Sequence, residues 1–265
     1  MKLRHHSYHV EIIGSGPPLL LLHGFTGSSA TWEMLGRRLQ SDYTVYCIDL
    51  LGHGQTVAAP YQRMRLTEQV KDLQDLLATR DETWSVLGYS MGGRIALMLA
   101  ATSKQVKQTI AVSTTPGIRS AHERRLRRQA DRRLADRLLT DGLPNFIAYW
   151  ESLPLFESQR HLPLEVQESI RRGRLGQSAE GLAASLIAQG TGNMAPVWHL
   201  LDAAAIDWIV GEEDVKFKKI ADEAALPEKI HLIPAASHAP HIDQPEKFVT
   251  IVEKLLLTNQ MGESK

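Results

Sequence analysis

The sequence predicts an α/β protein with a mostly parallel sheet that is flanked by helices. Through the first half of the chain, short apolar segments of strand-like composition alternate with helix-like segments. Several of the apolar segments are continuous, which is typical of strands buried on both faces of a parallel sheet. A long helical stretch then interrupts this alternation, and two more strand-like segments follow it. We therefore expect one layered core that carries a helical insertion.

The expected elements alternate from the start of the chain. In the first half the strands cover residues 10–13, 19–22, 45–48, 85–87 and 109–112, and the helices cover 31–39, 66–78 and 93–102. Residues 118–201 are expected to be helical only, because apolar side chains recur every four residues from Leu126 to Leu138. Strands return at 205–210 and 229–233, and an amphipathic helix covers 245–257.

One core with an insertion explains this order better than two separate domains. A chain of 265 residues can bury one large core, and no stretch rich in Ser, Gly or Pro resembles a flexible linker. We expect residues 1–117 to form the first part of the core, 118–202 a helical cap, and 203–265 the second part of the core.

The composition limits the class of partner. A formal net charge of zero argues against a general affinity for nucleic acid or for an anionic membrane surface. No N-terminal apolar stretch approaches the ~20 residues needed to cross a bilayer. The single Cys47 excludes an intrachain disulfide, and its apolar surroundings predict a buried strand residue. We expect a cytoplasmic protein without nucleic-acid or membrane partners, and the sequence leaves its oligomeric state open.

Arginines are dense in the expected cap. Six of them lie between residues 124 and 133, whereas no lysine occurs between Lys107 and Lys216. Planar guanidinium groups match carboxylates with two parallel hydrogen bonds, so this bias suits an anionic ligand. A solvated helix face with internal i,i+4 pairs, such as Arg127 with Asp131, is the alternative for most of them.

The sequence Gly88-Tyr-Ser-Met-Gly92 places Ser90 between an expected strand and an expected helix. This Gly-x-Ser-x-Gly pattern is the sequence form of a nucleophile elbow, a sharp turn that exposes the serine Oγ. The turn strains the serine backbone, and a Cβ at position 88 or 92 would collide with neighbouring backbone. The Met91 N–H would start the helix, where free donors and the helix dipole favour a developing negative charge. A glycine-rich turn with an ordinary serine is the alternative.

A reactive serine needs a histidine and an acid, which follow elbow serines in the order Asp or Glu, then His. Asp214 and His238 each follow an expected strand, at the sheet edge where open α/β sheets place their sites. We expect His238 to accept the Ser90 proton and Asp214 to orient the imidazole. The competing acids are Glu212 and Glu213, and the competing histidines are His231 and His241.

A second loop completes the expected site. The segment Leu22-His-Gly-Phe-Thr-Gly27 follows an apolar run, and its two glycines allow a tight loop that turns the Phe25 N–H toward Ser90. Together with the Met91 N–H, it would form an oxyanion hole. An ordinary strand-to-helix turn is the alternative.

These motifs, together with Asp49-Leu-Leu-Gly-His-Gly54, Gly211-Glu-Glu-Asp214 and Ser237-His-Ala-Pro-His-Ile-Asp-Gln-Pro-Glu246, resemble the α/β-hydrolase superfamily over nearly the whole chain. A tyrosine before Ser90 and an arginine four residues after it resemble a narrower family, the 2-succinyl-6-hydroxy-2,4-cyclohexadiene-1-carboxylate synthases of menaquinone biosynthesis. Segments 123–131 and 150–156 of the expected cap are also similar to that family.

The resemblance implies an α/β-hydrolase fold and a carbon–oxygen lyase that needs no cofactor or metal. The family eliminates pyruvate from 2-succinyl-5-enolpyruvyl-6-hydroxy-3-cyclohexene-1-carboxylate, a small polycarboxylate, and consumes no water. Ser90, activated by His238 and Asp214, would then act as a base and not be acylated, and the Phe25 and Met91 N–H groups would hold the oxyanion.

The positions that match the family's substrate contacts are Tyr89, Arg94, Arg127, Trp150, Arg174 and Lys216. Several of these assignments have alternatives. Arg94 could pair with a surface acid, Arg124 or Arg128 could replace Arg127, and Trp150 could be a core aromatic.

Two other functions stay open. The first is a serine hydrolase on the same scaffold, either an esterase or a C–C bond hydrolase that acts on a carboxylated small molecule. The second is a ligand receptor that kept the triad without turnover.

Overall fold

The computed structural model describes residues 1–4, 6–201 and 205–262, and it contains a seven-stranded sheet in the order β3-β5-β4-β6-β7-β8-β9. These strands are β3 (Val10–Ile13), β4 (Pro18–Leu22), β5 (Thr44–Ile48), β6 (Trp84–Tyr89), β7 (Val106–Val112), β8 (Ile206–Gly211) and β9 (Ile230–Ile233). Every neighbouring pair is parallel except β3 and β5. The short strands β1 (Lys2–Leu3) and β2 (His6–Ser7) pair separately. The prediction of an α/β fold with a mostly parallel sheet is confirmed.

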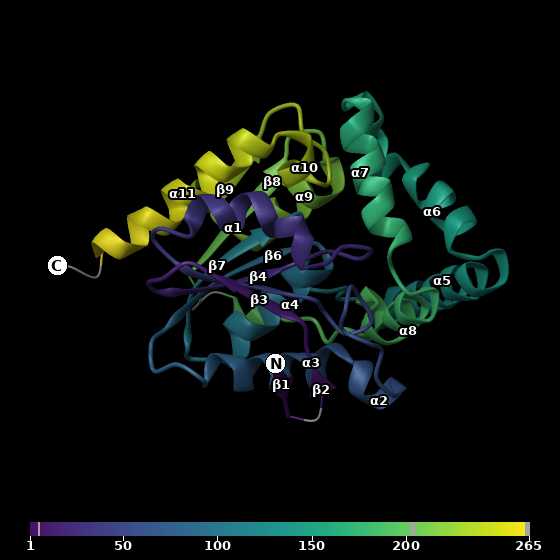
Figure 1. Cartoon of the computed structure of the whole chain (residues 1–265), viewed down its shortest axis with the longest axis horizontal. Helices are drawn as coiled ribbons and strands as arrows, with labels where there is room; N and C mark the ends of the chain where they lie inside the picture. The colour runs from purple at the N-terminus through teal and green to yellow at the C-terminus, as the bar shows by residue number, and fades with distance from the viewer. Residues whose placement is uncertain (5, 202–204, 263–265) are drawn as a thin grey trace.

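Helices cover both faces of the sheet (Figure 1). One face packs against α1 (Glu33–Leu39) and α11 (Pro245–Gly262), and the other against α3 (Leu66–Leu77), α4 (Met91–Thr102) and α9 (Val215–Ala224). Two further helices, α2 (Tyr61–Met64) and α10 (Pro240–Asp243), are short.

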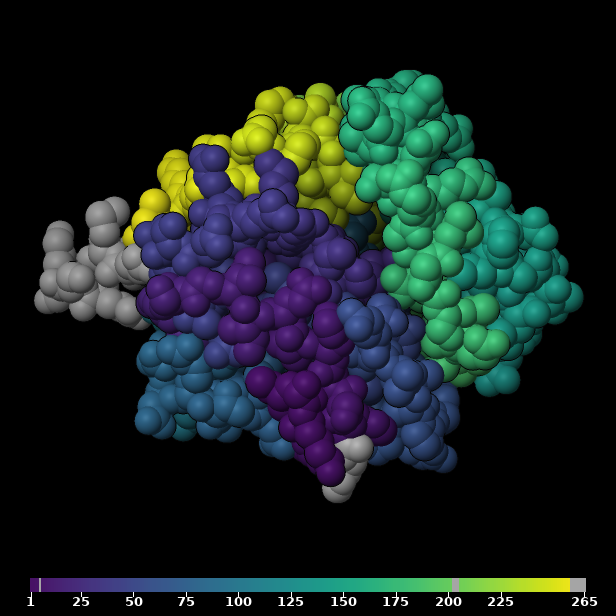
Figure 2. Space-filling model, viewed as in Figure 1, coloured from purple at the N-terminus to yellow at the C-terminus, as the bar shows by residue number. Residues whose placement is uncertain are grey.

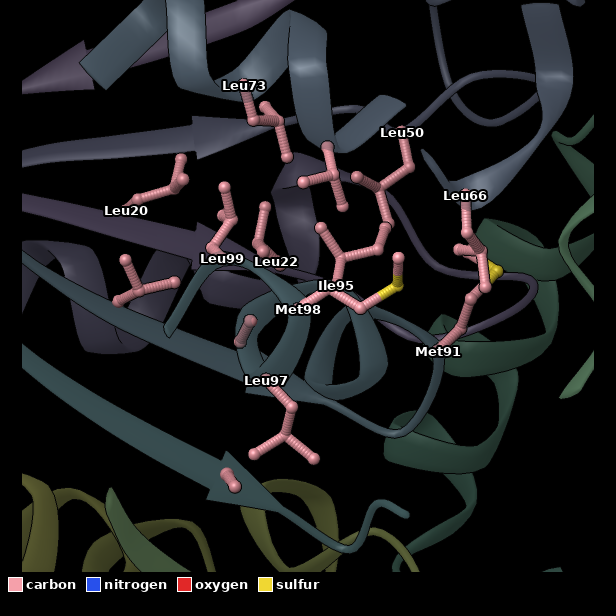
Figure 3. Packing of buried hydrophobic residues seen from close by; sticks show 14 of the residues in the cluster. Leu20, Leu22, Leu50, Leu66, Leu73, Met91, Ile95, Leu97, Met98 and Leu99 are labelled. Carbon is pink, nitrogen blue, oxygen red and sulfur yellow. The ribbon is translucent and has the colours of Figure 1, made fainter. Parts of the chain in front are cut away.

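Strand β4 shows why the apolar runs are continuous. Leu19 and Leu21 belong to the cluster with α1 and α11, whereas Leu20 and Leu22 belong to the cluster with α3 and α4. Figure 3 shows Leu20 and Leu22 next to Leu99 of α4. Because successive side chains point to opposite faces, a strand covered on both sides must be apolar at every position. The same rule accounts for the burial of Cys47 in β5. This burial raises the pKa of its thiol to about 12.

The described residues between β7 and β8 contain helices and no strand. They form α5 (Ala121–Asp141), α6 (Leu143–Glu151), α7 (Leu164–Leu175) and α8 (Ala179–Gln189), with 3-10 turns between and after them. These helices lie at one end of the sheet (Figure 1) and flank the core surface in Figure 2. They share an apolar cluster of their own. We interpret them as the expected cap, whose boundary at residue 202 lies outside the described residues.

The apolar i,i+4 series along α5 does not form one buried face. Leu138 is fully buried, but Leu126 is 50% exposed, and the inward face also carries Asp131 and Ala135. An i,i+4 series advances by slightly more than one helical turn, so it drifts by about 40° at each step. The two ends of the series therefore face different directions.

Candidate active site

The turn between β6 and α4 has the geometry of a nucleophile elbow. Ser90 adopts φ 49° and ψ −101°, a strained backbone conformation for a residue with a side chain. A Cβ at Gly88 would overlap the Gly92 carbonyl, and a Cβ at Gly92 would overlap the carbonyl of Leu22. The Thr114 hydroxyl donates to the Ser90 carbonyl oxygen at 2.7 Å and helps to hold the turn. Backbone packing thus enforces the strained serine.

Replacing Gly92 with alanine is expected to destabilise the protein by about 2–4 kcal/mol, because the new methyl group meets backbone that cannot move without shifting β4. Urea unfolding measures this effect. Gly173→Ala in α7 is the matched control, since a Cβ there has no neighbour within 4 Å. It should raise stability by roughly 0.5–1 kcal/mol through helix propensity. Equal losses in both variants would contradict the steric argument.

Ser90, His238 and Asp214 form one hydrogen-bonded chain. His238 Nε2 lies 3.1 Å from Ser90 Oγ, and His238 Nδ1 lies 2.9 Å from Asp214 Oδ2. The second carboxylate oxygen of Asp214 accepts the Phe217 N–H at 3.3 Å, at the start of α9. Donation from Nδ1 to the carboxylate leaves Nε2 unprotonated and able to accept the serine proton.

The competing acids and histidines form no hydrogen bond with Ser90, His238 or Asp214. Glu212 and Glu213 are exposed, while Asp214 is buried. His231 pairs with Asp207 through a 3.2 Å contact at the far end of β9. His241 lies close to Tyr89, with ring centroids 4.4 Å apart, and contacts neither Ser90 nor an acid.

His241 packs within a cluster of aromatic side chains. Both of its ring nitrogens are buried without a described partner, and its ring packs against Trp32 and Phe248. Burial, with a smaller effect from His238, lowers the pKa of His241 from 6.5 to about 3. The neutral form is therefore the one that the folded state keeps.

This shift makes stability depend on pH. Between pH 6.5 and about pH 3, His241 is protonated in the unfolded state and neutral in the folded state. Acidification through that range therefore favours unfolding. Between about pH 7 and about pH 5, His241 should lower the free energy of unfolding by about 2 kcal/mol. His241→Phe should reduce the pH-dependent loss in urea unfolding by that amount, whereas the exposed His122→Phe should not. Identical pH profiles for His241→Phe and the parent would refute the assignment.

The loop after β4 places Phe25 beside the elbow. Phe25 and Met91 both line the cavity that contains Ser90. Met91 is the first residue of α4, where helical geometry offers its N–H no acceptor within the helix. A Cβ at Gly24 would overlap the Tyr89 ring, so only glycine permits this close approach. The oxyanion hole itself stays a prediction.

His23 holds this loop, a role that the sequence analysis did not assign. Its Nδ1–H donates to the Gly24 carbonyl at 2.7 Å, and its Nε2 accepts the Leu50 N–H at 3.0 Å. Burial lowers the pKa of His23 to about 4, so the ring is neutral and can donate and accept at once. Its position between an apolar strand and a glycine was the available signal.

A cavity of about 220 Å³ joins Ser90 and His238 to three cationic side chains, Arg94, Arg127 and Lys216. Arg94 comes from the elbow helix and Arg127 from the cap helix α5. The cavity therefore lies between core and cap, and it combines a proton acceptor with a cationic wall.

Each cation has a different environment. Arg94 donates from Nη2 to the Gln189 carbonyl at 2.8 Å, and burial lowers its pKa to about 10, which leaves it charged at neutral pH. Arg127 donates from Nε to Asp131 Oδ1 at 2.8 Å. Burial of the amine also lowers the pKa of Lys216, and Arg127 adds to that effect.

Arg124 and Arg128, the alternatives to Arg127, face other groups. Arg124 donates to the carbonyl oxygens of Ile118 and Arg119, and Arg128 donates to that of Gly192. Neither lines the cavity. Of the three arginines, the structure brings Arg127 to the site.

Tyr89 and Trp150 form part of the apolar wall. Both line the cavity, and the Trp150 ring lies 5.2 Å from that of Phe25. Burial raises the pKa of the Tyr89 hydroxyl, so Tyr89 stays neutral. The indole Nε1 of Trp150 is buried without a described partner.

Arg174 does not line this cavity, and its contact with the substrate stays a prediction. It donates to Glu151 Oε1 at 3.1 Å and to Gln159 Oε1 at 2.9 Å. It lines a neighbouring cavity of about 340 Å³, which shares Phe25 and Tyr89 with the first. The ion pair with Glu151 satisfies the guanidinium within the cap, and no sequence pattern marked Glu151 as its partner.

Within residues 1–4, 6–201 and 205–262, no group of three or more His, Cys, Asp or Glu side chains could hold a metal ion. No helix in the described part of the chain is long and apolar enough to cross a membrane.

The sheet topology, the strained elbow and the Ser90–His238–Asp214 chain together define a protein of the α/β-hydrolase class. The sequence model of the alpha/beta hydrolase family matches residues 19–251. A protein of Bacillus subtilis named as a 2-succinyl-6-hydroxy-2,4-cyclohexadiene-1-carboxylate synthase is 41% identical over 246 residues, which cover 90% of this chain and 89% of that protein. The chain therefore belongs to the alpha/beta hydrolase family and, within it, to the 2-succinyl-6-hydroxy-2,4-cyclohexadiene-1-carboxylate synthases.

Solved structures agree with this placement. MenH from S. aureus superimposes with a TM-score of 0.90 at 33% identity, covering 96% of this chain and 99% of that one. A thermophilic esterase from Thermogutta terrifontis, solved with malate bound, gives a TM-score of 0.81 at 26% identity, covering 95% and 93% of the two chains. The second match shows how closely a hydrolase can share this fold.

Proposed function

We propose that this chain eliminates pyruvate from 2-succinyl-5-enolpyruvyl-6-hydroxy-3-cyclohexene-1-carboxylate to give 2-succinyl-6-hydroxy-2,4-cyclohexadiene-1-carboxylate. The observation that carries the proposal is the single cavity in which Ser90 and His238 face Arg94, Arg127 and Lys216. The substrate has three carboxylates, and cationic donors in a partly desolvated pocket are the groups that bind such a polyanion.

The reaction begins with removal of the ring proton at C2, which is acidic because it lies next to the succinyl ketone. Ser90 Oγ takes this proton as its own passes to His238 Nε2, 3.1 Å away. The electron pair of the C2–H bond forms a C2–C3 double bond, the C3–C4 double bond shifts to C4–C5, and the C5–O bond breaks. The departing enolpyruvyl group regains one proton and becomes pyruvate. No water is consumed.

Charge that develops on the succinyl ketone oxygen needs donors fixed in advance. The N–H groups of Phe25 and Met91 are the donors that we assign to it, each worth ~3 kcal/mol in comparable sites. Because His23 holds the Phe25 loop and α4 holds Met91, neither donor has to move during the reaction.

The substrate carboxylates pair with Arg94, Arg127 and Lys216, whereas Tyr89 and Trp150 cover the ring. Arg174 is paired with Glu151, and its direct contact with the substrate stays a prediction. We further propose that the enzyme acts in the cytoplasm on this small polycarboxylate, without a cofactor and without nucleic-acid or membrane partners.

A pyruvate-coupled assay with the authentic intermediate tests the proposal. We expect stoichiometric release of pyruvate from the intermediate, and no covalent labelling of Ser90 when the protein is incubated with an activated ester. A burst with an activated ester, covalent labelling of Ser90 and no pyruvate from the intermediate would favour the esterase or C–C bond hydrolase instead. Binding of the intermediate without any turnover would favour a receptor.

A further inference from the structure

Two charged side chains that line the cavity each have a buried polar atom without a partner within the described part of the chain. One is Asp131 Oδ2, an acceptor on a side chain that is only 3% exposed, and the other is Arg94 Nε, a donor. Both residues line the cavity that contains Ser90. Buried polar groups without partners are rare and costly, so the pair needs an explanation.

Arg127 and Gly190 hold the Asp131 carboxylate at the wall of the cavity. Its Oδ1 accepts the Arg127 Nε–H at 2.8 Å. A Cβ at Gly190 would overlap Asp131 Oδ2, so glycine leaves the space that the carboxylate occupies. Gly190 also lines the cavity. Burial raises the pKa of Asp131 and Arg127 opposes the shift, as expected for a carboxylate that lacks a second donor.

The unpaired atoms specify the chemistry of a ligand. A carboxylate would satisfy the unpaired Arg94 Nε, and it could also pair with the Nη groups of Arg127, whose Nε is bound to Asp131. It could not donate to Asp131, and it would repel that residue. A hydroxyl next to the carboxylate would donate to Asp131 Oδ2 and complete the set.

The compound named in the relatives carries this pair of groups, since its hydroxyl is on ring carbon 6 and its carboxylate is on the adjacent carbon 1. We propose that Asp131 Oδ2 accepts a hydrogen bond from the C6 hydroxyl of the substrate, while Arg94 and Arg127 bind the C1 carboxylate. Asp131 thereby selects substrates with a hydroxyl beside a carboxylate. This assignment rests on the proposed function, and it names the substrate groups that the site recognises.

Binding of simple ring acids tests this selection without turnover. The probes are cis- and trans-2-hydroxycyclohexane-1-carboxylate, compared with cyclohexane-1-carboxylate, and calorimetry or ligand-observed NMR gives each Kd. We expect the parent protein to prefer one hydroxy acid by about 10-fold or more, the effect typical of a hydrogen bond to a charged group.

Asp131→Asn keeps an acceptor for Arg127 Nε but removes the charged acceptor for the hydroxyl. It should reduce the preference to roughly 2-fold or less, while cyclohexane-1-carboxylate binds within about 3-fold of the parent. Asp131→Ala should also abolish the preference, and it serves as the second variant if Asp131→Asn folds poorly. Asp136→Asn, at an exposed position of the same helix, should keep the preference.

Two results would overturn the assignment. One is a parent protein that does not distinguish any hydroxy acid from cyclohexane-1-carboxylate. The other is an Asp131→Asn variant that weakens all three acids equally, because Asp131 would then only position Arg127. Failure of the pyruvate assay with an intact hydroxy-acid preference would reject the proposed reaction and leave the hydroxyl site standing.

Discussion

Replacing Ser90 with alanine is expected to lower kcat/KM for pyruvate release by about 10⁴-fold, because the base that meets the ring proton is lost while the cavity stays intact. The assay is pyruvate release from the authentic intermediate, with circular dichroism and thermal unfolding to show that the fold persists. Alanine keeps the Cβ of serine, so the elbow strain at φ 49° is unchanged and stability should change little.

The matched control for this change is Ser103→Ala. Ser103 follows the last residue of the same helix α4, at the end far from the cavity. That variant should keep kcat/KM within about 2-fold of the parent, because surface changes away from a site have small effects. Elimination by Ser90→Ala at more than a tenth of the parent rate would show that His238 alone suffices as the base and would refute the role of Ser90.

Arg94→Ala is expected to lower kcat/KM by about 10²–10³-fold, mainly through KM, because the cavity loses its most buried guanidinium. Charged hydrogen bonds in desolvated sites are worth ~1.5–3 kcal/mol each, and Arg94 retains a donor with no described acceptor. Initial rates over a range of substrate concentrations separate KM from kcat.

Arg94→Lys keeps the charge without the planar fork and should lose only about 10-fold. Arg133→Ala, an exposed arginine of the cap helix α5, should change kcat/KM by less than 2-fold. If Arg94→Ala stays within a few-fold of the parent, the carboxylate-binding role of Arg94 is wrong.

The strands and the triad could be predicted from the sequence because both depend on local patterns. Continuous apolar runs mark strands buried on two faces, and the buried residues of β4 follow that rule. Glycines at 88 and 92 mark a turn in which a Cβ at either position would overlap neighbouring backbone. Asp214 and His238 are recognisable because they follow strands whose carboxyl ends share one edge of the sheet.

The cap was harder to predict. Its residues are placed by packing between helices, and the direction of each side chain depends on the rotation of its helix. Leu126 of the apolar i,i+4 series is exposed, while Asp131, which the alternative of a solvated helix face paired with Arg127, is buried. Arg174 is paired with Glu151 inside the cap, a contact that no sequence pattern indicated.

The sequence by itself therefore determined the α/β class, the nucleophile elbow and the residues of the hydrogen-bonded chain, because glycine sterics and strand polarity act over a few residues. Only the tertiary structure decided which arginines share a cavity with Ser90, that Asp131 lines the same cavity with an unpaired oxygen, and that His23 holds the loop of Phe25. These contacts join segments separated by tens of residues, and their geometry comes from the packing of the cap on the sheet edge.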